Sequence, residues 1–404
     1  MTQKTKRSAD VIVIGGGPAG LILTCRLAQE GIRVICIDRD DPKASLHETF
    51  DGRTTAISYG SRNIMEKADL WTPIEKKACA IKDIQILDDG SPVLLEFLVN
   101  ELNKEAFGWI VENRDLRETL YQRIRDLKTA QHLAPAAVKE ISTQNNEVQV
   151  TLASGETLTA RLVIGADGRQ SFTREQSNIG TRGWSYRQRA LVCTVTHEKP
   201  HHNIAIEHFR PEGPFAVLPM PKSEKGEYRS SVVWTEHGPD KKSARHYAPD
   251  IFEAALNTRF PEWYGQVRLK GNIFSYPLGL THAQSYVARR TALVADAAHG
   301  IHPIAGQGLN IGLRDVDALA TILAVAHQEK QDLGSDDVLG TYQASRLADN
   351  MAMITATDTL NKLFSNDIGP LKGLRRIGLR TVNKINPARR FFMRQAMGLP
   401  MTKK

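Results

Sequence analysis

The chain has 404 residues, of which 41% are apolar and 24% are charged, a composition typical of globular proteins and unlike that of disordered or fibrous ones. The formal net charge of +8 is modest for this length and does not indicate binding to nucleic acid. The four cysteines show no metal-ligand spacing, so we expect free thiols and no metal site. No apolar run approaches the roughly 18 residues of a membrane span, and no signal core precedes the first strand, so a cytoplasmic protein is expected.

A strand, a glycine-rich turn, a helix and a second strand are predicted in order near the N-terminus. The β-branched run at 10–14 predicts a buried strand, residues 21–29 predict a helix, and residues 33–38 predict the next strand. The turn carries the pattern G-x-G-x-x-G. Its glycines permit a tight turn, close approach of a pyrophosphate and close packing of helix on strand, and they are Gly15, Gly17 and Gly20.

An acidic residue completes this unit. Asp38 closes the second strand, eighteen residues after Gly20, where a carboxylate accepts hydrogen bonds from a ribose diol and repels a 2′-phosphate. The N-terminus of the helix favours phosphate groups. The unit therefore predicts a dinucleotide other than NADP, but it does not distinguish FAD from NAD.

Two later segments have the same strand-to-turn character. Residues 160–168 predict a buried strand that ends in Gly-Ala-Asp-Gly, which includes Asp167, and residues 291–299 predict another that ends at Asp296. A glycine-rich loop follows at 302–312 and leads into an apolar helix. Because backbone N–H groups converge at such junctions, they suit an anionic or electron-rich group, and Asp296 is placed to accept a hydrogen bond from a polyol.

Together the motifs GGGPAG, GADG and ADAAH-x3-P-x2-GQGLN-x-G-x2-D resemble those of the FAD-dependent aromatic hydroxylases, the fold group of para-hydroxybenzoate hydroxylase. The third motif usually opens with Gly-Asp, and Ala295 replaces that glycine here, from which we expect a small local adjustment. The segments DGRTTAIS at 51–58, VENRDL at 111–116 and RFFMRQAMG at 390–398 further resemble the ubiquinone-biosynthesis hydroxylases. This likeness covers nearly the whole chain.

Carried over position by position, the resemblance implies a set of FAD-binding residues. The first glycines would bind the pyrophosphate, Asp38 the adenosine ribose and Asp296 the ribityl chain, while the Asp167 turn is tied in the family to both FAD and NAD(P)H. No catalytic base is identified. The implied set is Gly15, Gly17, Gly20, Asp38, Arg53, Asn113, Asp167, Asp296, Gly306, Gly308 and Asn310. Alternative interpretations are an exposed salt bridge for Arg53 and a structural role for Asn113.

The expected fold is α/β, with a Rossmann-like FAD-binding domain interleaved with a substrate domain of mixed or antiparallel sheet. Alternating segments such as 84–87, 190–195 and 230–234 predict that second sheet. The FAD-binding domain is assigned to residues 1–75, 105–180 and 275–330, the substrate domain to 76–104 and 181–274, and a helical C-terminal region to 331–404.

The resemblance implies a monooxygenase that reduces FAD, forms a flavin hydroperoxide with dioxygen and hydroxylates a polyprenylated phenol of ubiquinone biosynthesis. The chain has one G-x-G-x-x-G, whereas a permanent pyridine-nucleotide domain would normally show a second. NAD(P)H or another electron donor is therefore expected to bind only transiently. Other interpretations stay open. They are a hydroxylase or reductase of another aromatic or prenyl-lipid substrate, and a non-catalytic flavoprotein in a biosynthetic complex.

The C-terminal tail is basic and amphipathic. Residues 368–404 contain ten Lys or Arg and no Asp or Glu, and apolar residues recur among them at roughly helical spacing. Such a pattern suits either contact with an anionic membrane on its cytoplasmic face, a partner in a ubiquinone-biosynthesis complex, or packing on the protein's own domain. We expect His299 and His302 to make ordinary loop contacts, and His197, His201, His202 and His208 to lie in surface loops.

Overall fold

In the computed structural model, the residues described are 6–47, 53–88, 94–144, 146–301, 306–364 and 369–399. The strands expected around the glycine motifs form one six-stranded sheet in the order β19-β20-β13-β2-β3-β9, parallel except where β19 meets β20. Its strands are β2 (Val11–Ile14), β3 (Val34–Ile37), β9 (Ala130–Leu133), β13 (Leu162–Gly165), β19 (Val287–Ala288) and β20 (Thr291–Leu293).

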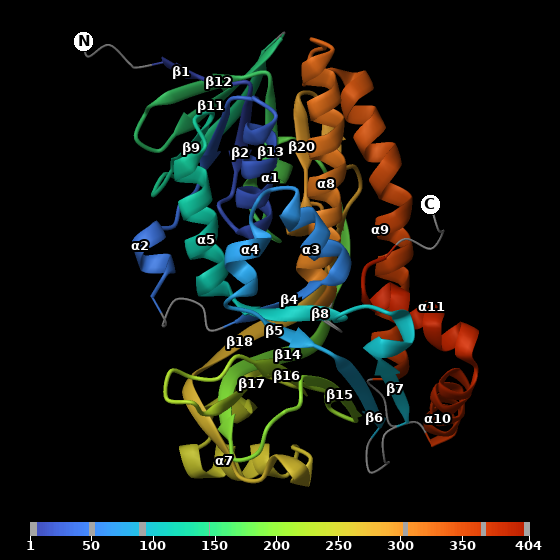
Figure 1. Cartoon of the computed structure of the whole chain (residues 1–404). Helices are drawn as coiled ribbons and strands as arrows, with labels where there is room; N and C mark the ends of the chain where they lie inside the picture. Colours follow the sequence, from blue (N-terminus) through green and yellow to red (C-terminus); the bar gives the residue numbers. More distant parts are fainter. Residues whose placement is uncertain are drawn as a thin grey trace.

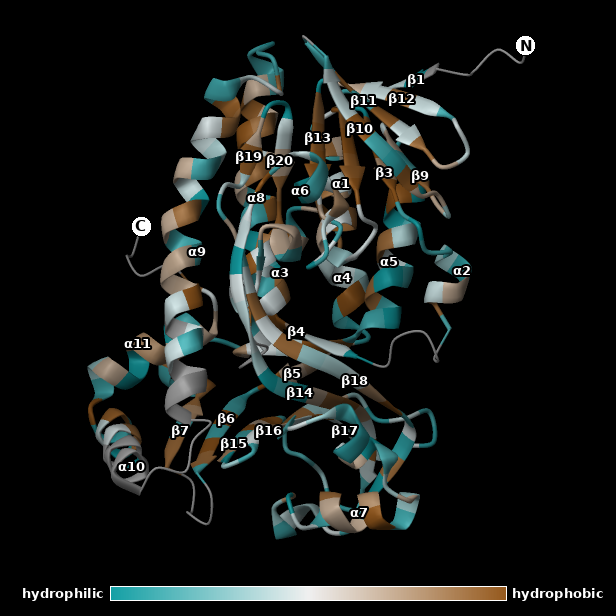
Figure 2. Cartoon of the chain, turned by 180° about the vertical axis from the view of Figure 1, so that it is seen from behind, coloured by the Kyte–Doolittle hydropathy of each residue, from teal (hydrophilic) through white to brown (hydrophobic). Residues whose placement is uncertain are grey.

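Both faces of this sheet are covered, which explains its continuous apolar strands (Figure 2). One face packs on α1 (Pro18–Gln29), α5 (Asn113–Asp126) and α8 (Gln307–Gln328). The other packs on a four-stranded sheet in the order β1-β12-β11-β10. The strands of this second sheet are β1 (Lys6–Ser8), β10 (Val138–Gln144), β11 (Glu147–Leu152) and β12 (Thr157–Ala160).

A three-stranded sheet, β4-β8-β5, lies between the parallel sheet and a larger sheet below it (Figure 1). Its strands are antiparallel, and they follow the N-terminal strand–turn–helix–strand unit in the chain. These strands and the short helices of the upper part are β4 (Thr54–Ser58), β5 (Cys79–Ile81), β8 (Gly108–Glu112), α2 (Pro42–Ser45), α3 (Tyr59–Glu66), α4 (Trp71–Glu75) and α6 (Phe172–Gln176).

The larger sheet has eight strands in the order β21-β18-β14-β17-β16-β15-β6-β7, and all neighbours except β15 and β6 run antiparallel. Helix α7 (Pro249–Asn257) covers its far face through Phe252 and Leu256. The strands are β6 (Asp83–Asp88), β7 (Leu95–Leu98), β14 (Thr181–His197), β15 (Ile204–Arg210), β16 (Gly213–Met220), β17 (Tyr228–His237), β18 (Val267–Ala283) and β21 (His299–Gly300).

The C-terminal region is helical, as expected, with α9 (Asp336–Phe364), α10 (Gly369–Lys384) and α11 (Asn386–Ala396). Helix α9 runs alongside α8, and α10 and α11 lie beside β6 and β7 (Figure 1). The mixed α/β fold is therefore confirmed. The division into domains stays a proposal, and its boundary between residues 274 and 275 falls inside the continuous strand β18.

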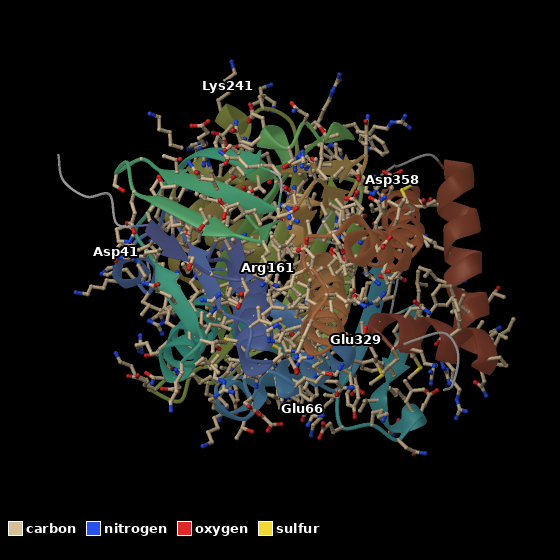
Figure 3. All side chains as sticks on the ribbon, turned by 90° about the horizontal axis from the view of Figure 1, so that it is seen from above. Asp41, Glu66, Arg161, Lys241, Glu329 and Asp358 are labelled. Carbon is tan, nitrogen blue, oxygen red and sulfur yellow. The ribbon has the colours of Figure 1, made fainter. Side chains whose placement is uncertain are left out.

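Most charged side chains lie outside, as the labelled Asp41 and Lys241 illustrate in Figure 3. Among the described residues two aspartates are fully buried, and each is paired with an arginine. Asp88 lies 2.8 Å from the Nε of Arg376, and Asp315 lies 2.9 Å from the Nε of Arg346. Burial of a carboxylate is tolerated when it is paired and hydrogen-bonded, so these pairs fix the positions of α10 and α9 respectively.

The expectation that the histidine group lies in surface loops is wrong for His197 and His201, which are buried, and for His208, which is partly buried within β15. The Nδ1 of His197 is 2.7 Å from the carbonyl of Lys199, and its Nε2 is 3.0 Å from the Oγ of Ser230. The Nε2 of His201 is 3.0 Å from the carbonyl of Met220. These hydrogen bonds satisfy the ring nitrogens and so permit burial. All four cysteines are free thiols, also buried.

Candidate functional site

The first glycine turn leaves open space at the start of α1. Gly17 is the N-cap residue, with φ −70° and ψ 172°, and no side chain caps the helix there. The first N–H groups of α1 are therefore available to an anion. A methyl group added at Gly17 would meet nothing within 4 Å. This combination of free N–H groups and an uncovered backbone fits a pyrophosphate.

Asp38 lies against the same turn. A Cβ at Gly16 would be 2.3 Å from the Oδ2 of Asp38, so the carboxyl group and the glycine backbone are in contact. The Oδ1 accepts a hydrogen bond from the backbone N–H of Asp40 at 3.2 Å. Burial raises the pKa of Asp38 above its ordinary value, which is expected of a carboxylate at the edge of a ligand cradle.

The Gly-Ala-Asp-Gly turn touches the first turn but directs its aspartate elsewhere. A Cβ at Gly15 would be 2.4 Å from the carbonyl oxygen of Ala166, so the two turns pack directly together. The Oδ2 of Asp167 accepts hydrogen bonds from the N–H (2.9 Å) and Oγ1 (3.0 Å) of Thr173, and its Oδ1 accepts one from the Oγ of Ser171. The carboxylate of Asp167 thus fixes the start of α6, and only the turn's backbone faces the glycine loop.

Asp296 follows the neighbouring strand. The N–H of Val294 bonds the carbonyl of Gly165 at 3.0 Å, which aligns the end of β20 with the second turn. The side chain of Asp296 is 43% exposed, and its Oδ2 lies 3.5 Å from the Nε of Arg169. A partly exposed carboxylate held at this edge is free to accept a hydrogen bond from a ligand hydroxyl.

Ala295 adopts φ +53°, a left-handed conformation that favours glycine. The expected local adjustment is thus small, since the alanine keeps that backbone shape. Its N–H bonds the Oδ2 of Asp315 at 3.1 Å, and its methyl group lies where a Cβ on Gly312 would be only 2.6 Å away. These contacts hold the strained residue in place.

The start of α8 is fixed to β4 by Asn310. Its Nδ2 donates to the carbonyls of Ala56 (2.8 Å) and Gly306 (2.9 Å), and its Oδ1 accepts from the N–H of Ser58 (2.9 Å). Gly306 has φ +63°, and a Cβ there would lie 2.8 Å from that of Ala56. Gly308 faces open space. The amide of Asn310 is therefore structural, and the backbone around Gly308 remains open to a ligand.

Arg53 and Asn113 lie together at the opposite end of β4. The N–H of Asn113 donates to the carbonyl of Arg53 at 3.1 Å, and its buried side chain accepts a hydrogen bond from the Oγ1 of Thr55 at 2.5 Å. The guanidinium of Arg53 lies over the ring of Tyr276, 4.9 Å from its centroid. Arg53 thus spans the gap between β4 and β18. Two of the segments singled out in the sequence are described only in part. Residues 51–52 of the segment 51–58, and residues 302–305 of the glycine-rich loop, which include His302, lie outside the described residues.

A buried charge network beneath the third motif was missed by the sequence analysis. The Nε2 of His299 is 2.5 Å from the Oδ2 of Asp315, so its contact is not the ordinary loop contact expected. Asn350 donates to Asp315 at 2.9 Å and accepts from Arg346 at 2.7 Å. Burial alone would raise the pKa of Asp315, but His299 and Arg346 hold it below its ordinary value. The sequence did contain one signal for this network, the pair Arg346 and Asn350, which lie four residues apart in the C-terminal region expected to be helical.

Comparisons with known proteins agree with this geometry. Residues 8–357 match the family model described as an FAD binding domain. The chain is 43% identical over 398 residues to "Ubiquinone hydroxylase UbiL" of Rhodospirillum rubrum, covering 98% of this chain and 91% of that protein. The chain belongs to the FAD-dependent monooxygenases of the ubiquinone hydroxylase family.

Further relatives support the same assignment. The "3-demethoxyubiquinol 3-hydroxylase" of Escherichia coli is 31% identical, with 98% of this chain and all of that protein covered (100%). The crystal structure of p-nitrophenol 4-monooxygenase from Pseudomonas putida superimposes with a TM-score of 0.80 at 19% identity, over 98% of this chain and 100% of that one. The latter likeness concerns the fold alone.

The residues present fit FAD as the cofactor of this enzyme. The open backbone at Gly17 and the carboxyl group of Asp38 suit the pyrophosphate and adenosine ribose, while Asp296 and the open backbone at Gly308 suit the polyol and the ring system. The role of each residue in binding FAD stays a prediction.

Gly17→Ala places a methyl group in the open cradle. Since φ at Gly17 suits alanine, we expect a stability loss of at most about 1 kcal/mol but a loss of about tenfold or more in FAD affinity. Fluorescence titration of the apoprotein with FAD measures this. The control Gly340→Ala, also facing open space but within α9, should stabilise slightly and leave FAD affinity unchanged. Equal affinity in Gly17→Ala would contradict the assignment.

Asp296→Ala removes the proposed acceptor for a ribityl hydroxyl. Hydrogen bonds to charged groups contribute about 1.5–3 kcal/mol, so the purified variant should retain about ten- to a hundredfold less FAD at limiting cofactor. The ratio of flavin to protein absorbance gives the occupancy. Asp126→Ala, an exposed acid at the end of α5, serves as the control. Unchanged occupancy in Asp296→Ala would remove Asp296 from the site.

Proposed function

We propose that this enzyme hydroxylates the aromatic ring of a polyprenylated phenol in ubiquinone biosynthesis. The observation that carries the proposal is the 43% identity to a ubiquinone hydroxylase over 98% of the chain. Bound FAD supplies the redox chemistry that activates dioxygen, the co-substrate, with electrons from NAD(P)H or another donor.

The chain's own groups support this chemistry at two places. Gly306 caps α8 without a side-chain hydrogen bond, so the first N–H groups of α8 offer positive potential to negative charge on a reduced ring system. The face of the eight-stranded sheet that is turned toward β4 and β8 is largely apolar, with Ala205, Leu218 and Met220 in one hydrophobic cluster with Ile110. Such a surface suits a prenylated ring and limits access of water.

Incorporation of oxygen tests the proposal directly. FAD-loaded protein, reduced chemically under anaerobic conditions, is mixed with isotopically labelled dioxygen and a prenylated phenol. We expect a hydroxylated product that carries one labelled oxygen, measured by mass spectrometry. A prenylated benzene without the hydroxyl group is the matched control and should stay unmodified because its ring is less electron-rich. Hydrogen peroxide as the sole product, with the phenol unchanged, would refute the proposed substrate class.

The basic tail supports a second proposal, that the enzyme works as a peripheral protein on the inner face of the cytoplasmic membrane. Part of the tail packs on the protein itself, because Leu379, Val382 and Met393 join the cluster around β7. Two adjacent aromatic side chains remain outside, Phe391 (47% exposed) and Phe392 (44% exposed), with ring centroids 5.5 Å apart. In the described part of the chain no helix is long and apolar enough to cross a membrane.

These exposed rings lie within a strongly cationic segment. Lys384 and Arg390 of the same segment are exposed as well, and a mixture of aromatic and basic groups suits the interface of an anionic bilayer. Deleting residues 368–404 would uncover the apolar cluster that Met393 and Met397 close. Point substitutions are therefore the better test.

The double variant Phe391→Ser, Phe392→Ser should bind anionic vesicles at least about tenfold more weakly, since it loses two apolar side chains from the interface. Cosedimentation with vesicles of phosphatidylglycerol measures the partition, and vesicles of phosphatidylcholine show the dependence on charge. Tyr247→Ser, an equally exposed aromatic near α7, is the control. If the double variant binds vesicles as the wild type does, the membrane proposal fails. A partner protein would then be the better candidate to cover the surface around Phe391 and Phe392.

A further inference from the structure

Glu207, an acidic residue of the large sheet, has its side chain on the face that is turned toward the interior of the molecule. Glu207 lies on β15, where Ile206 belongs to the cluster covered by α7 and Ala205 belongs to the cluster that contains residues of β4, β5 and β8. Because successive side chains of a strand point to opposite faces, Glu207 shares the face of Ala205. Its register partner Ile86 packs in the same cluster, which confirms the direction.

The neighbours of Glu207 on this face are apolar. The residues directly opposite it on the adjoining strands are Ile86 on β6 and Ala216 on β16. The row continues across the sheet without another charge. Its members in order are Leu95, Ile86, Glu207, Ala216, Val233, Val192 and Phe274. A carboxylate in the middle of such a row is costly to bury unless something binds it.

Among the described residues no hydrogen bond or ion pair engages the carboxyl group of Glu207. The residue is only partly buried by exposed area, yet protein surrounds its carboxyl group densely enough that burial raises its pKa to about 7. Since its row neighbours are apolar and no described group binds it, the carboxyl group is available to a polar ligand that reaches this face.

This face of the sheet is also the one that approaches the candidate FAD site. Ser231, on the same face of β17, accepts a hydrogen bond at 2.9 Å from the Oγ1 of Thr54, the residue after Arg53. Ala56 of β4, which contacts Gly306 at the start of α8, belongs to the same cluster as Ala205. The strand β4 therefore joins the FAD-binding segments to the face that carries Glu207.

We propose that Glu207 binds the phenolic hydroxyl group of the substrate and accepts its proton. This rests on the proposed function, since it requires a phenol. In the step the phenol O–H bond breaks, the proton moves to a carboxylate oxygen of Glu207, and the negative charge moves from the carboxylate to the phenolate oxygen. No electron is transferred. The phenolate ring is richer in electrons at the positions that accept oxygen, so the residue acts as a general base.

Other charged groups on the elements packed against this face are mostly neutralised in pairs. They are Asp88 with Arg376, Glu112 with Arg229, and Glu101 with Arg389, besides Arg53 over Tyr276 and Arg394 on α11. Desolvation is the single cause of the raised pKa of Glu207. Above about pH 7 the carboxylate form prevails and accepts the proton, and this capacity is lost as the pH falls through that value.

The test compares Glu207→Gln, which keeps the shape but accepts no proton, with Glu207→Asp and the control Glu212→Gln. Glu212 is exposed in the turn between β15 and β16. Each FAD-loaded protein is reduced chemically and mixed with dioxygen and a short-chain prenylated phenol from about pH 5 to about pH 9. Single-turnover product formation is measured. Phenol binding is followed separately through the flavin absorbance, and thermal melting checks folding.

In the wild type and Glu212→Gln, product formation should fall as the pH falls through about 7. Glu207→Gln should be slower by about a hundredfold above that pH, with no such pH step in product formation or in phenol binding. Glu207→Asp should recover part of the rate of product formation, and the pH at which that rate falls should differ from the wild-type value.

Two results for Glu207→Gln would overturn the inference. One is the wild-type rate of product formation. The other is a rate reduced by the same factor at every pH, with the fall of the rate at low pH still present. These outcomes leave the proposed function intact, because the wild type still hydroxylates the phenol. If the wild type itself gives only hydrogen peroxide, the proposed function fails, and the role of Glu207 fails with it.

Discussion

The alignment of four neighbouring strands at one edge of the parallel sheet is the constraint on which the site depends. β3, β2, β13 and β20 run in the same direction, and their carboxyl ends lead into Asp38, the glycine turn, the Gly-Ala-Asp-Gly turn and Asp296. Residues more than 250 positions apart in the chain thus meet because backbone hydrogen bonds fix the register. Ligands of α/β folds bind at this edge for the same reason.

The third motif is held in place by charge rather than by the sheet alone. Asp315 in α8 binds His299 and the N–H of Ala295 on one side, and Arg346 and Asn350 of α9 on the other. Removing one partner would leave a buried charge unmatched, which costs about 3–5 kcal/mol. The C-terminal helix α9 therefore has a direct influence on the turn that carries Asp296, although it contributes no residue to the glycine motifs.

Local patterns predicted the part of the fold that depends on backbone geometry. The glycine turn and the strand ends follow from short-range rules, and the structure confirms them. Side-chain direction was harder to predict. The carboxylate of Asp167 is bound by Ser171 and Thr173 just after it, a local choice that the turn motif does not specify. The burial of His197 and His201 depends on partners distant in the sequence, Ser230 and Met220. Glu207 was missed because one acid in an alternating strand looks like an ordinary exposed position until the opposing elements are known.

The central claim is that three separate segments bind one FAD molecule. A crystal structure of the flavin-loaded protein measures this most directly. The account predicts a single FAD whose pyrophosphate lies over Gly17, whose adenosine ribose lies at Asp38 and whose ribityl chain lies at Asp296. Electron density that places FAD away from any one of these three residues would contradict the account.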